Sequence, residues 1–366
     1  MILKTDEFRD ACKLILAAID NKESTLFTET LELKAKDRVL KLNVTNREYY
    51  CTVEFPLESD EVFNAAVNAS VFLRLISKLT TDTIELTKEN TSIKIKSNGE
   101  YKLPMIFNND KMVELPIIEI ENVTTTMHIN SDILNSIAIY NSKELQRGEG
   151  TRPVQKYYYV DEHGAITFTS GACVNSFNLE SPIKILLSDK VVKLFKLFPF
   201  NSDVEFTMGQ DPVTEELVQT KVRFSMSGIT ITAKLSDSGL ISSVPVDAIR
   251  GMANKAYPYS VVINKNEFSA AINRLILLND SSYGFFTFTR ENITIKDNSK
   301  ENLEMITCVN ECEALENYEN ILNINSLRLM LDGSDDDYVT INFGDERAVV
   351  FKKNVISDII PEMKMR

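Results

Sequence analysis

The sequence has few of the residues that interrupt regular structure and few of those that bind metals. Only 12 glycines and 10 prolines occur among 366 residues, which excludes a collagen-like or disordered chain. The two histidines, His128 and His163, have no cysteine or second histidine at ligand spacing. Neither is therefore expected to bind a metal or to act in catalysis. The length predicts a folded protein of two or three domains.

Cysteine pairs and long apolar runs are also missing. The five cysteines are spread along the chain without a Cys-x-x-Cys pair, and Cys308 and Cys312 lack the second pair that a zinc site needs. No run approaches the ~18 apolar residues of a membrane span. The first residues lack the apolar stretch and cleavage site of a signal peptide. We therefore expect a cytoplasmic protein with reduced thiols.

Basic residues are outnumbered, 40 against 53 acidic ones, which gives a net charge of −13. This excludes a protein that coats nucleic acid or membrane with its whole surface. A Gly-x-x-x-x-Gly-Lys loop is absent, so the chain is not expected to hydrolyse nucleoside triphosphates. The acids of Asp332–Asp337 lack the spacing of a calcium loop. We interpret them as a solvated turn, with a metal-dependent hydrolase built on them as an alternative.

The chain contains three copies of one plan. The segment Lys4–Cys12 aligns with Asn264–Ile272 and more loosely with Asn130–Ala138. In each copy a short apolar strand precedes a polar N-cap-like residue, an acid in the first turn and apolar residues at helical spacing. This pattern predicts three repeats, each beginning with a strand and a helix.

Each copy also predicts a second helix, at 69–79, 188–198 and 325–331, followed by an alternating strand at 83–87, 203–207 and 338–342. Alternating strands with short turns are typical of antiparallel sheets with one solvated face. The predicted fold class is α+β, with three repeated helix-and-sheet domains at 1–122, 123–254 and 255–366. The seams are expected near Glu121–Asn122 and within Gly251–Lys255.

Four short segments carry a resemblance to a known family. Thr151–Val154 is similar to a Thr-Arg-Pro-Val/Ile segment, Phe168–Gly171 stands where the family has Ala-Thr-Asp-Gly, and Ala233–Gly239 resembles Ser-Lys-Leu-Val/Ile-Asp-Gly. The last residues, Met363–Arg366, are similar to a Met-Pro-Met-Arg tail. In this order and over the full length, the chain resembles the bacterial DNA polymerase sliding clamp, the beta subunit of the replicative polymerase. It resembles a divergent, for example phage-encoded, member.

The resemblance implies a ring-forming DNA clamp without catalytic activity or cofactor. Two chains of three domains would form a homodimer ring, with two helices per domain on the inner face and antiparallel sheets outside. The ring would encircle duplex DNA independently of sequence and tether DNA polymerase and other partners. A separate clamp loader ATPase would open it. A clamp-fold scaffold that binds proteins without encircling DNA is the alternative.

The predicted helices are basic although the chain is acidic. Past their first turns they carry only Asp10, Glu144 and Asp332 as acids. This bias indicates a nucleic-acid-facing surface. Its basic residues are Arg9, Lys13, Arg74, Lys78, Lys143, Arg147, Lys190, Lys193, Lys196, Arg274 and Arg328. The resemblance adds Lys22 and Arg152, at loop positions near DNA in the family.

The resemblance also implies two protein contacts. At the dimer joint, Tyr101 and Leu103 on an edge strand would meet Ile276 and Leu277 at the end of a third-repeat helix. A partner-peptide pocket between the second and third domains would be lined by Gln155, Thr169, Gly171, Ala172, Cys173, Val174, Ile241, Val246, Met363 and Met365. Gln155 replaces a family Leu, Ala172 and Cys173 replace His-Arg, and Leu240–Ser243 lacks Phe-Pro-Asp, so the preferred peptide stays open.

Overall fold

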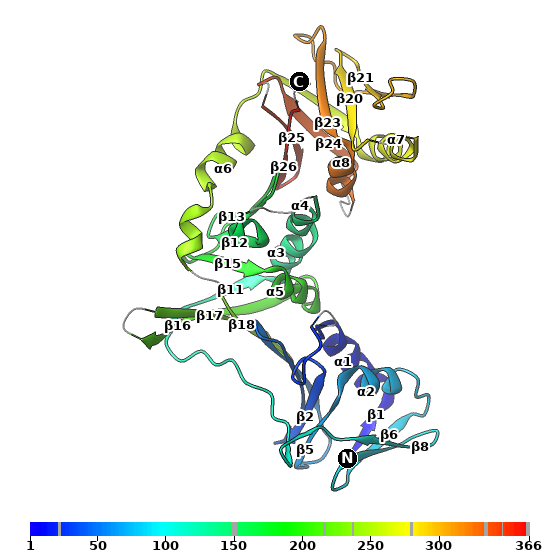
Figure 1. Ribbon diagram of the computed structural model, residues 1–366, viewed down its shortest axis with the longest axis vertical. Helices are drawn as coiled ribbons and strands as arrows, with labels where there is room; N and C mark the ends of the chain where they lie inside the picture. Colours follow the sequence, from blue (N-terminus) through cyan, green and yellow to red (C-terminus); the bar gives the residue numbers. More distant parts are fainter. Residues whose placement is uncertain are drawn as a thin grey trace. The chain divides into compact units, whose positions relative to one another are not determined.

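The computed structural model describes residues 1–20, 23–147, 152–214, 217–235, 238–278, 281–332, 336–345 and 347–363. The chain forms two compact units (Figure 1). The first unit contains Met1–Leu134 and Lys190–Ser236, and the second contains Asn135–Asp189 and Asp237–Arg366. Lys22 and Met365, two of the predicted site residues, lie outside the described residues.

The order of elements repeats three times as strand, helix, four strands, helix and three strands. The first copy consists of β1 (Ile2–Lys4), α1 (Thr5–Ala17), β2 (Thr30–Lys36), β3 (Val39–Thr45), β4 (Tyr49–Pro56), β5 (Phe63–Asn68), α2 (Ala69–Ile76), β6 (Thr83–Lys88), β7 (Ser92–Lys96) and β8 (Glu100–Pro104). A small hairpin of β9 (Phe107–Asn108) and β10 (Lys111–Met112) follows.

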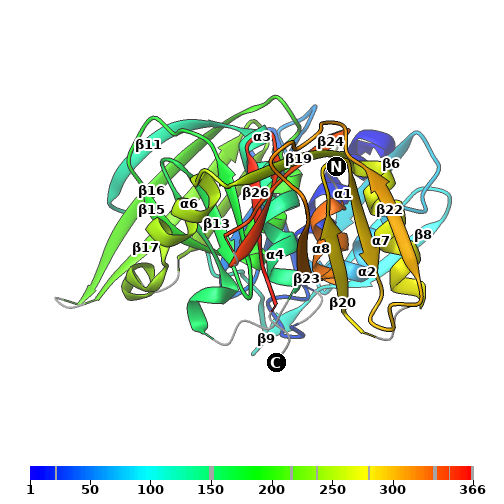
Figure 2. The ribbon, with the colours of Figure 1, turned by 90° about the horizontal axis from the view of Figure 1, so that it is seen from above.

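The second copy has a composite first helix with a π-helical middle turn. It consists of β11 (Val123–Asn130), α3 (Ser131–Ser136), η1 (Ile137–Asn141), α4 (Ser142–Arg147), η2 (Pro153–Lys156), β12 (Tyr157–Asp161), β13 (Gly164–Phe168), β14 (Ala172–Ser176), β15 (Lys184–Ser188), α5 (Asp189–Lys193), η3 (Leu194–Leu197), β16 (Asp203–Thr214), β17 (Leu217–Met226) and β18 (Ile229–Lys234). The strands β16 and β17 pair along their length and extend beyond their neighbours β11 and β18 (Figure 2).

The third copy follows a helical connector. The connector contains η4 (Ser238–Ser243) and α6 (Val246–Asn254). The copy consists of β19 (Tyr259–Asn264), α7 (Lys265–Leu278), β20 (Tyr283–Phe288), β21 (Asn292–Lys296), β22 (Leu303–Thr307), β23 (Tyr318–Asn323), α8 (Ile324–Leu331), β24 (Tyr338–Phe343), β25 (Ala348–Lys353) and β26 (Ile356–Pro361). The predicted α+β class with antiparallel sheets and repeated helices is confirmed.

Within each copy the strands form two half-sheets of four. The second to fifth strands of each copy make one half-sheet, in the orders β5-β2-β3-β4, β15-β12-β13-β14 and β23-β20-β21-β22. The first strand and the last three make the other half-sheet, in the orders β1-β6-β7-β8, β11-β16-β17-β18 and β19-β24-β25-β26. The half ending in β4 joins the half ending in β18, and the half ending in β14 joins the half ending in β26. Two eight-stranded antiparallel sheets result, and for this reason the two compact units cut across the middle repeat.

Several of the helices begin after a capping asparagine. The side chain of Asn68 accepts a hydrogen bond from Val71 N at 3.0 Å before α2, and Asn323 accepts one from Ser326 N at 3.0 Å before α8. Such a cap satisfies one of the first backbone N–H groups of a helix. α1 packs on β3 and β4 and contacts α2 and η3, whereas α8 contacts both α4 and α7. Among the described residues no helix combines the length and apolarity needed to cross a membrane.

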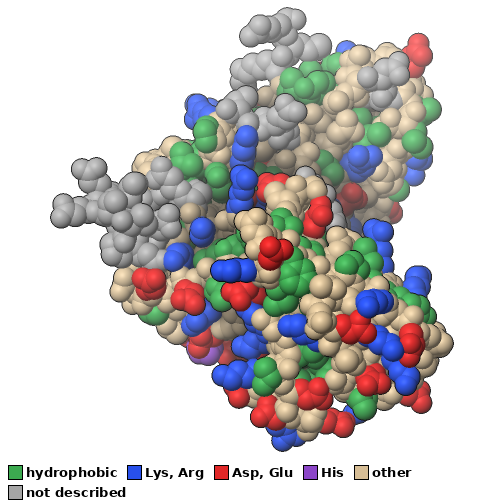
Figure 3. All heavy atoms as spheres, turned by 60° about the horizontal axis from the view of Figure 1, so that its bottom comes forward, with side chains coloured by type: hydrophobic (Ala, Val, Ile, Leu, Met, Phe, Trp, Pro, Cys, Tyr) green, Lys and Arg blue, Asp and Glu red, His purple; other side chains and the backbone are tan. Residues whose placement is uncertain are grey.

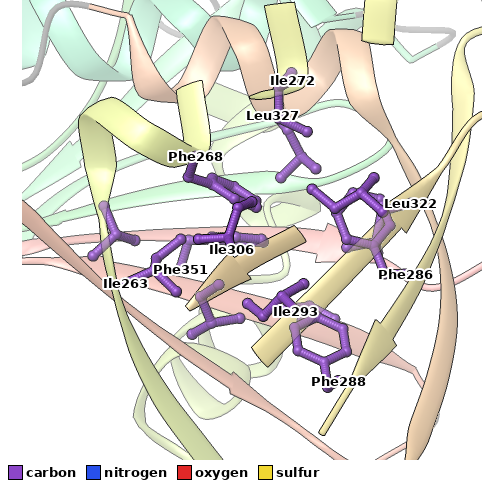
Figure 4. Packing of buried hydrophobic residues seen from close by; sticks show 14 of the residues in the cluster. Ile263, Phe268, Ile272, Phe286, Phe288, Ile293, Ile306, Leu322, Leu327 and Phe351 are labelled. Atoms are coloured by element: carbon purple, nitrogen blue, oxygen red, sulfur yellow. The ribbon is translucent and has the colours of Figure 1, made fainter. Parts of the chain in front are cut away.

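The core of the second unit shows how the helices cover the sheets (Figure 4). Phe268 and Ile272 of α7 point toward side chains of the four-stranded sheet, including Phe286 and Ile306. Phe351 of β25 enters the same cluster from the eight-stranded sheet, so one core is shared by two sheets and two helices. Fully burying such a side chain is worth ~1.5–3 kcal/mol.

Both connectors between repeats cross the sheet face opposite the helices, and a buried carboxylate holds each one. Leu115 and Ile118 of the first connector are buried, and Leu115 N donates to Glu32 Oε1 at 3.4 Å. In the second, Arg250 of α6 donates to both oxygens of Asp161. The residues expected to form the second seam, Gly251–Asn254, thus belong to a helix that packs on a sheet.

Candidate nucleic-acid interface and partner site

Four of the predicted basic residues present an exposed side chain without a carboxylate partner among the described residues. They are Arg74 on α2, Lys78 just after it, Lys196 on η3 and Arg328 on α8. Lys193 on α5 and Arg152 before η2 are exposed as well. In the view of Figure 3, lysine and arginine are interspersed with aspartate and glutamate. A few exposed cations favour weak contacts with phosphates over tight electrostatic binding.

Four other predicted cations already have partners. Lys13 pairs with Asp10 at 2.7 Å, and Arg9 pairs with Asp6 at 2.7 Å while also donating to the carbonyl of Leu79. Arg274 binds both oxygens of Glu304 at 2.7 Å. Lys190 lies among three carboxylates. Their positive charges are matched within the chain, which the charge pattern of the helices did not reveal.

The prediction for Arg147 is wrong. Its side chain is only 1% exposed, so it cannot face a ligand in solvent. Nη1 lies 2.5 Å from Glu144 Oε2, and Nη2 lies 3.2 Å from Asp358 Oδ1. Asp358 in turn pairs with Lys353, which donates to the carbonyl of Met330 in α8. Arg147 is therefore part of a buried ion-pair network that joins α4, β25, β26 and α8.

The apolar residues predicted for the partner pocket come together in one cluster. Ala172 and Val174 of β14 belong to a buried group on the connector side of the eight-stranded sheet, and Ile241 and Val246 of the connector pack against it half-buried. Additional members that were not predicted for the pocket include Val154, Phe168 and Met252. These additional members could have been recognised in the sequence from the alternating apolar residues of the strands and from the apolar residues of the connector.

Three polar or small members of the predicted pocket lie beside the end of β13. Gln155 Nε2 donates to the Thr169 carbonyl at 3.0 Å, and its Oε1 accepts from Arg152 N at 2.9 Å. Thr169 N and Oγ1 both donate to Glu144 Oε1. A Cβ at Gly171 would collide with the Ile359 carbonyl, so the close approach of these backbones requires glycine there.

Two predicted pocket residues lie elsewhere. Cys173 is fully buried on the other face of β14, because successive residues of a strand alternate between faces. Burial and the neighbouring Asp358 raise the pKa of its thiol well above the usual value. Met363 donates its N–H to Ile321 O at 3.0 Å and lines a separate pocket of about 390 Å³ with Phe285 and Tyr318.

The residues of the predicted dimer joint lie on β8 in the first unit and at the end of α7 in the second. Tyr101 and Leu103 are half-exposed on β8, one of the two outer strands of its sheet. Ile276 packs against the core, whereas Leu277 beside it is 85% exposed. The structure adds Leu303 and Met305, which are 54% and 65% exposed on β22, an outer strand of the other four-stranded sheet.

The alternative metal site receives no support from geometry. Asp336 accepts a hydrogen bond from Asn354, and residues 333–335 lie outside the described part of the chain. Among the described residues, no three His, Cys, Asp or Glu side chains are grouped as metal ligands. His128 is exposed and lies 2.8 Å from Asp203, and His163 is exposed beside Glu162.

Comparison with known proteins agrees with this architecture. No protein-family model matches the chain. A beta sliding clamp of Mycoplasmopsis pulmonis is 28% identical over 153 residues, which cover 39% of this chain and 39% of that relative. A DnaN sliding clamp from Pseudomonas aeruginosa has a TM-score of 0.80 at 14% identity, covering 100% of this chain and 99% of that one.

A DNA polymerase sliding clamp from Bacillus subtilis gives a TM-score of 0.78 at 18% identity with the same coverage. The expected resemblance is thus confirmed in two independent ways, by sequence over part of the chain and by fold over all of it. The chain has the fold of the bacterial sliding clamps along its whole length and resembles the beta sliding clamps in sequence.

Proposed function

We propose that this chain is a DNA sliding clamp, a non-enzymatic processivity factor that closes into a homodimer ring around duplex DNA and tethers DNA polymerase. The proposal rests on two of the half-sheets, which join no other half-sheet among the described residues. Within the chain, β18 pairs with β4 and β26 pairs with β14. The equivalent strands β8 and β22 are left as outer strands of four-stranded sheets.

The repeat therefore supports pairing of β8 in one chain with β22 in another. Such a head-to-tail contact is heterologous, and it gives a closed ring when the rotation between subunits closes. Tyr101 and Leu103 would enter this joint from one chain. Ile276, Leu277 and the exposed Leu303 and Met305 would enter it from the other. Covering these apolar side chains removes two sheet edges that would otherwise promote aggregation.

The charge distribution supports retention by encirclement. Arg74, Lys78, Lys196 and Arg328 offer a few weak phosphate contacts, with Lys193, Arg152 and the loop residue Lys22 as further candidates. A ring needs no more than this, because DNA leaves it only through an opening or a free end. The net charge of −13 disfavours strong binding that would hinder sliding.

The connector side of the second eight-stranded sheet is the proposed partner site. Ala172, Val174, Ile241 and Val246 supply an apolar surface, with Gln155, Thr169 and Gly171 at its rim. Met365, which lies outside the described residues, completes the proposed set, since flexible methionines suit a surface that receives several partners, whereas Met363 lines a separate pocket. The domains 1–122, 123–254 and 255–366, a separate loader ATPase and a cytoplasmic location belong to the same proposal.

Retention on circular DNA tests the proposal directly. The protein is loaded onto nicked circular duplex DNA, isolated by gel filtration at high salt, and the circle is then cut once. A ring should stay on the circle and be lost after cutting, because only a topological link depends on free ends. Equal retention before and after cutting contradicts encirclement, and a dimer that is never retained favours the protein-binding scaffold.

A further inference from the structure

The ammonium of Lys190 lies among three carboxylates that all come from the first repeat. Nζ is 2.8 Å from Glu23 Oε1, 3.0 Å from Asp20 Oδ2 and 3.4 Å from Glu48 Oε1. The Lys190 side chain is 28% exposed and that of Asp20 only 8%. Burial alone would lower the pKa of Lys190, but the hydrogen bonds to Glu23 and Asp20 outweigh it and raise the pKa above its usual value.

The three acids belong to two segments that are themselves tied together. Asp20 and Glu23 follow α1, whereas Glu48 lies in the turn between β3 and β4. In that turn, Asn46 Nδ2 donates to Asp20 Oδ2 at 3.2 Å, and the Tyr49 hydroxyl donates to the carbonyl of Ala18 at 2.6 Å. Lys190 joins this set from α5 in the second repeat, so it links both segments to a different part of the chain.

We propose that Lys190 is a positioning residue that anchors the segment after α1 and takes no part in direct contact with DNA phosphates. One cation among three carboxylates leaves a formal charge of −2 around its ammonium, which repels a phosphate instead of attracting it. The connection to DNA rests on the proposed function. Lys22, which lies outside the described residues, is the loop cation that the resemblance places near DNA.

Charge exchange between Lys190 and Glu23 provides a sharp test. K190E alone puts a fourth acid into the group and removes the lysine that pairs with the other three. The double variant E23K/K190E again has one lysine and three acids. K196Q is the matched control, because Lys196 is an exposed cation on the adjoining helical turn. Circular dichroism of each variant separates a local effect from loss of the fold.

Hydrogen–deuterium exchange of the segment 23–30 is the first readout, since its amides bond locally, as Glu29 N does to Thr25 O at 3.1 Å. We expect exchange there to be roughly tenfold faster in K190E, because charged hydrogen bonds that hold the segment are lost. Exchange should return to the original rate in E23K/K190E and be unaffected in K196Q. Unchanged exchange in K190E, or no rescue in a folded double variant, overturns the anchor.

The salt dependence of DNA retention is the second readout. A plot of log affinity against log salt has a negative slope, and removing one phosphate contact lowers the magnitude of that slope by ~0.9. K196Q should therefore lower the slope, whereas K190Q should leave it unchanged. A lower slope in K190Q makes Lys190 a phosphate contact and contradicts the proposal. If the unaltered protein is not retained on circular DNA, the proposed function fails, and the exchange experiment still decides the role of Lys190.

Discussion

Replacing Arg147 with alanine separates a structural cation from a DNA-facing one. The guanidinium is 1% exposed and lies between Glu144 and Asp358, which are 0% and 3% exposed. Removing one partner of such a buried group costs ~3–5 kcal/mol, because a carboxylate stays buried without its countercharge. Thr169 still donates to Glu144 and Lys353 still pairs with Asp358. We therefore expect R147A to lower the free energy of unfolding by about 3 kcal/mol, the lower end of that range.

The loss of stability in R147A should depend on pH in a defined direction. Burial raises the pKa of Glu144, and Arg147 is the main group that opposes this rise. Without Arg147 the pKa rises further above the unfolded value of about 4.3, so the folded state holds a proton that the unfolded state releases. The deficit of R147A should accordingly be small near pH 4 and grow as the pH rises to 7.

Urea unfolding followed by circular dichroism measures this effect, since the chain has no tryptophan for fluorescence. R74A is the matched control, because Arg74 is exposed and its loss should change the free energy of unfolding by only about 0.5 kcal/mol. Removing both partners in E144Q/R147M should cost less than R147A alone. If R147A unfolds like R74A and instead weakens DNA retention, the network is not structural and Arg147 contacts DNA.

Two further predictions concern the joint and the second connector. L277D places a charge where the proposed joint buries an apolar side chain, so sedimentation should fall from twice 41.5 kDa to a single chain. V62D, at a 90% exposed site, should leave the mass unchanged, and a persistent L277D dimer would place the joint elsewhere. Burial favours a higher pKa for Asp161, but its bonds from Arg250 outweigh this and lower it. Its stabilisation is therefore present above the unfolded value of about 3.9 and is lost as the pH falls through the lower folded pKa. The melting temperature of D161N should lie below that of the unaltered protein at pH 7 and approach it near pH 2, whereas a constant difference would exclude this linkage.

The sequence pattern predicted those helices and strands whose stability depends on residues close by in the sequence. The segment 69–79 was expected to be a helix, and α2 covers Ala69–Ile76 with the Asn68 cap and a buried apolar face. The helix α6 was missed, because its second half was interpreted as part of the seam at Gly251–Lys255. Its formation depends on burying Ile249 and Ala253 against a sheet and on the bond from Arg250 to Asp161, 89 residues away. A nine-residue helix is too short to be stable by itself, so its formation depends on these tertiary contacts.

For the basic helices, too, neighbouring residues predicted one property, and residues distant in the sequence determined another. A helical position of a cation can be predicted from its neighbours, but its availability depends on the carboxylate opposite, and Asp358 lies 211 residues from Arg147. Once the paired and buried cations are removed, Arg74, Lys78, Lys196 and Arg328 are the clearest candidates for phosphate contacts. At a slope of ~0.9 per contact, four contacts lose about a hundredfold in affinity between 50 and 200 mM salt. Contacts so sensitive to salt cannot hold a polymerase on its template by themselves. For this reason the outer strands β8 and β22, which would close the ring, matter more to the proposed function than any single cation.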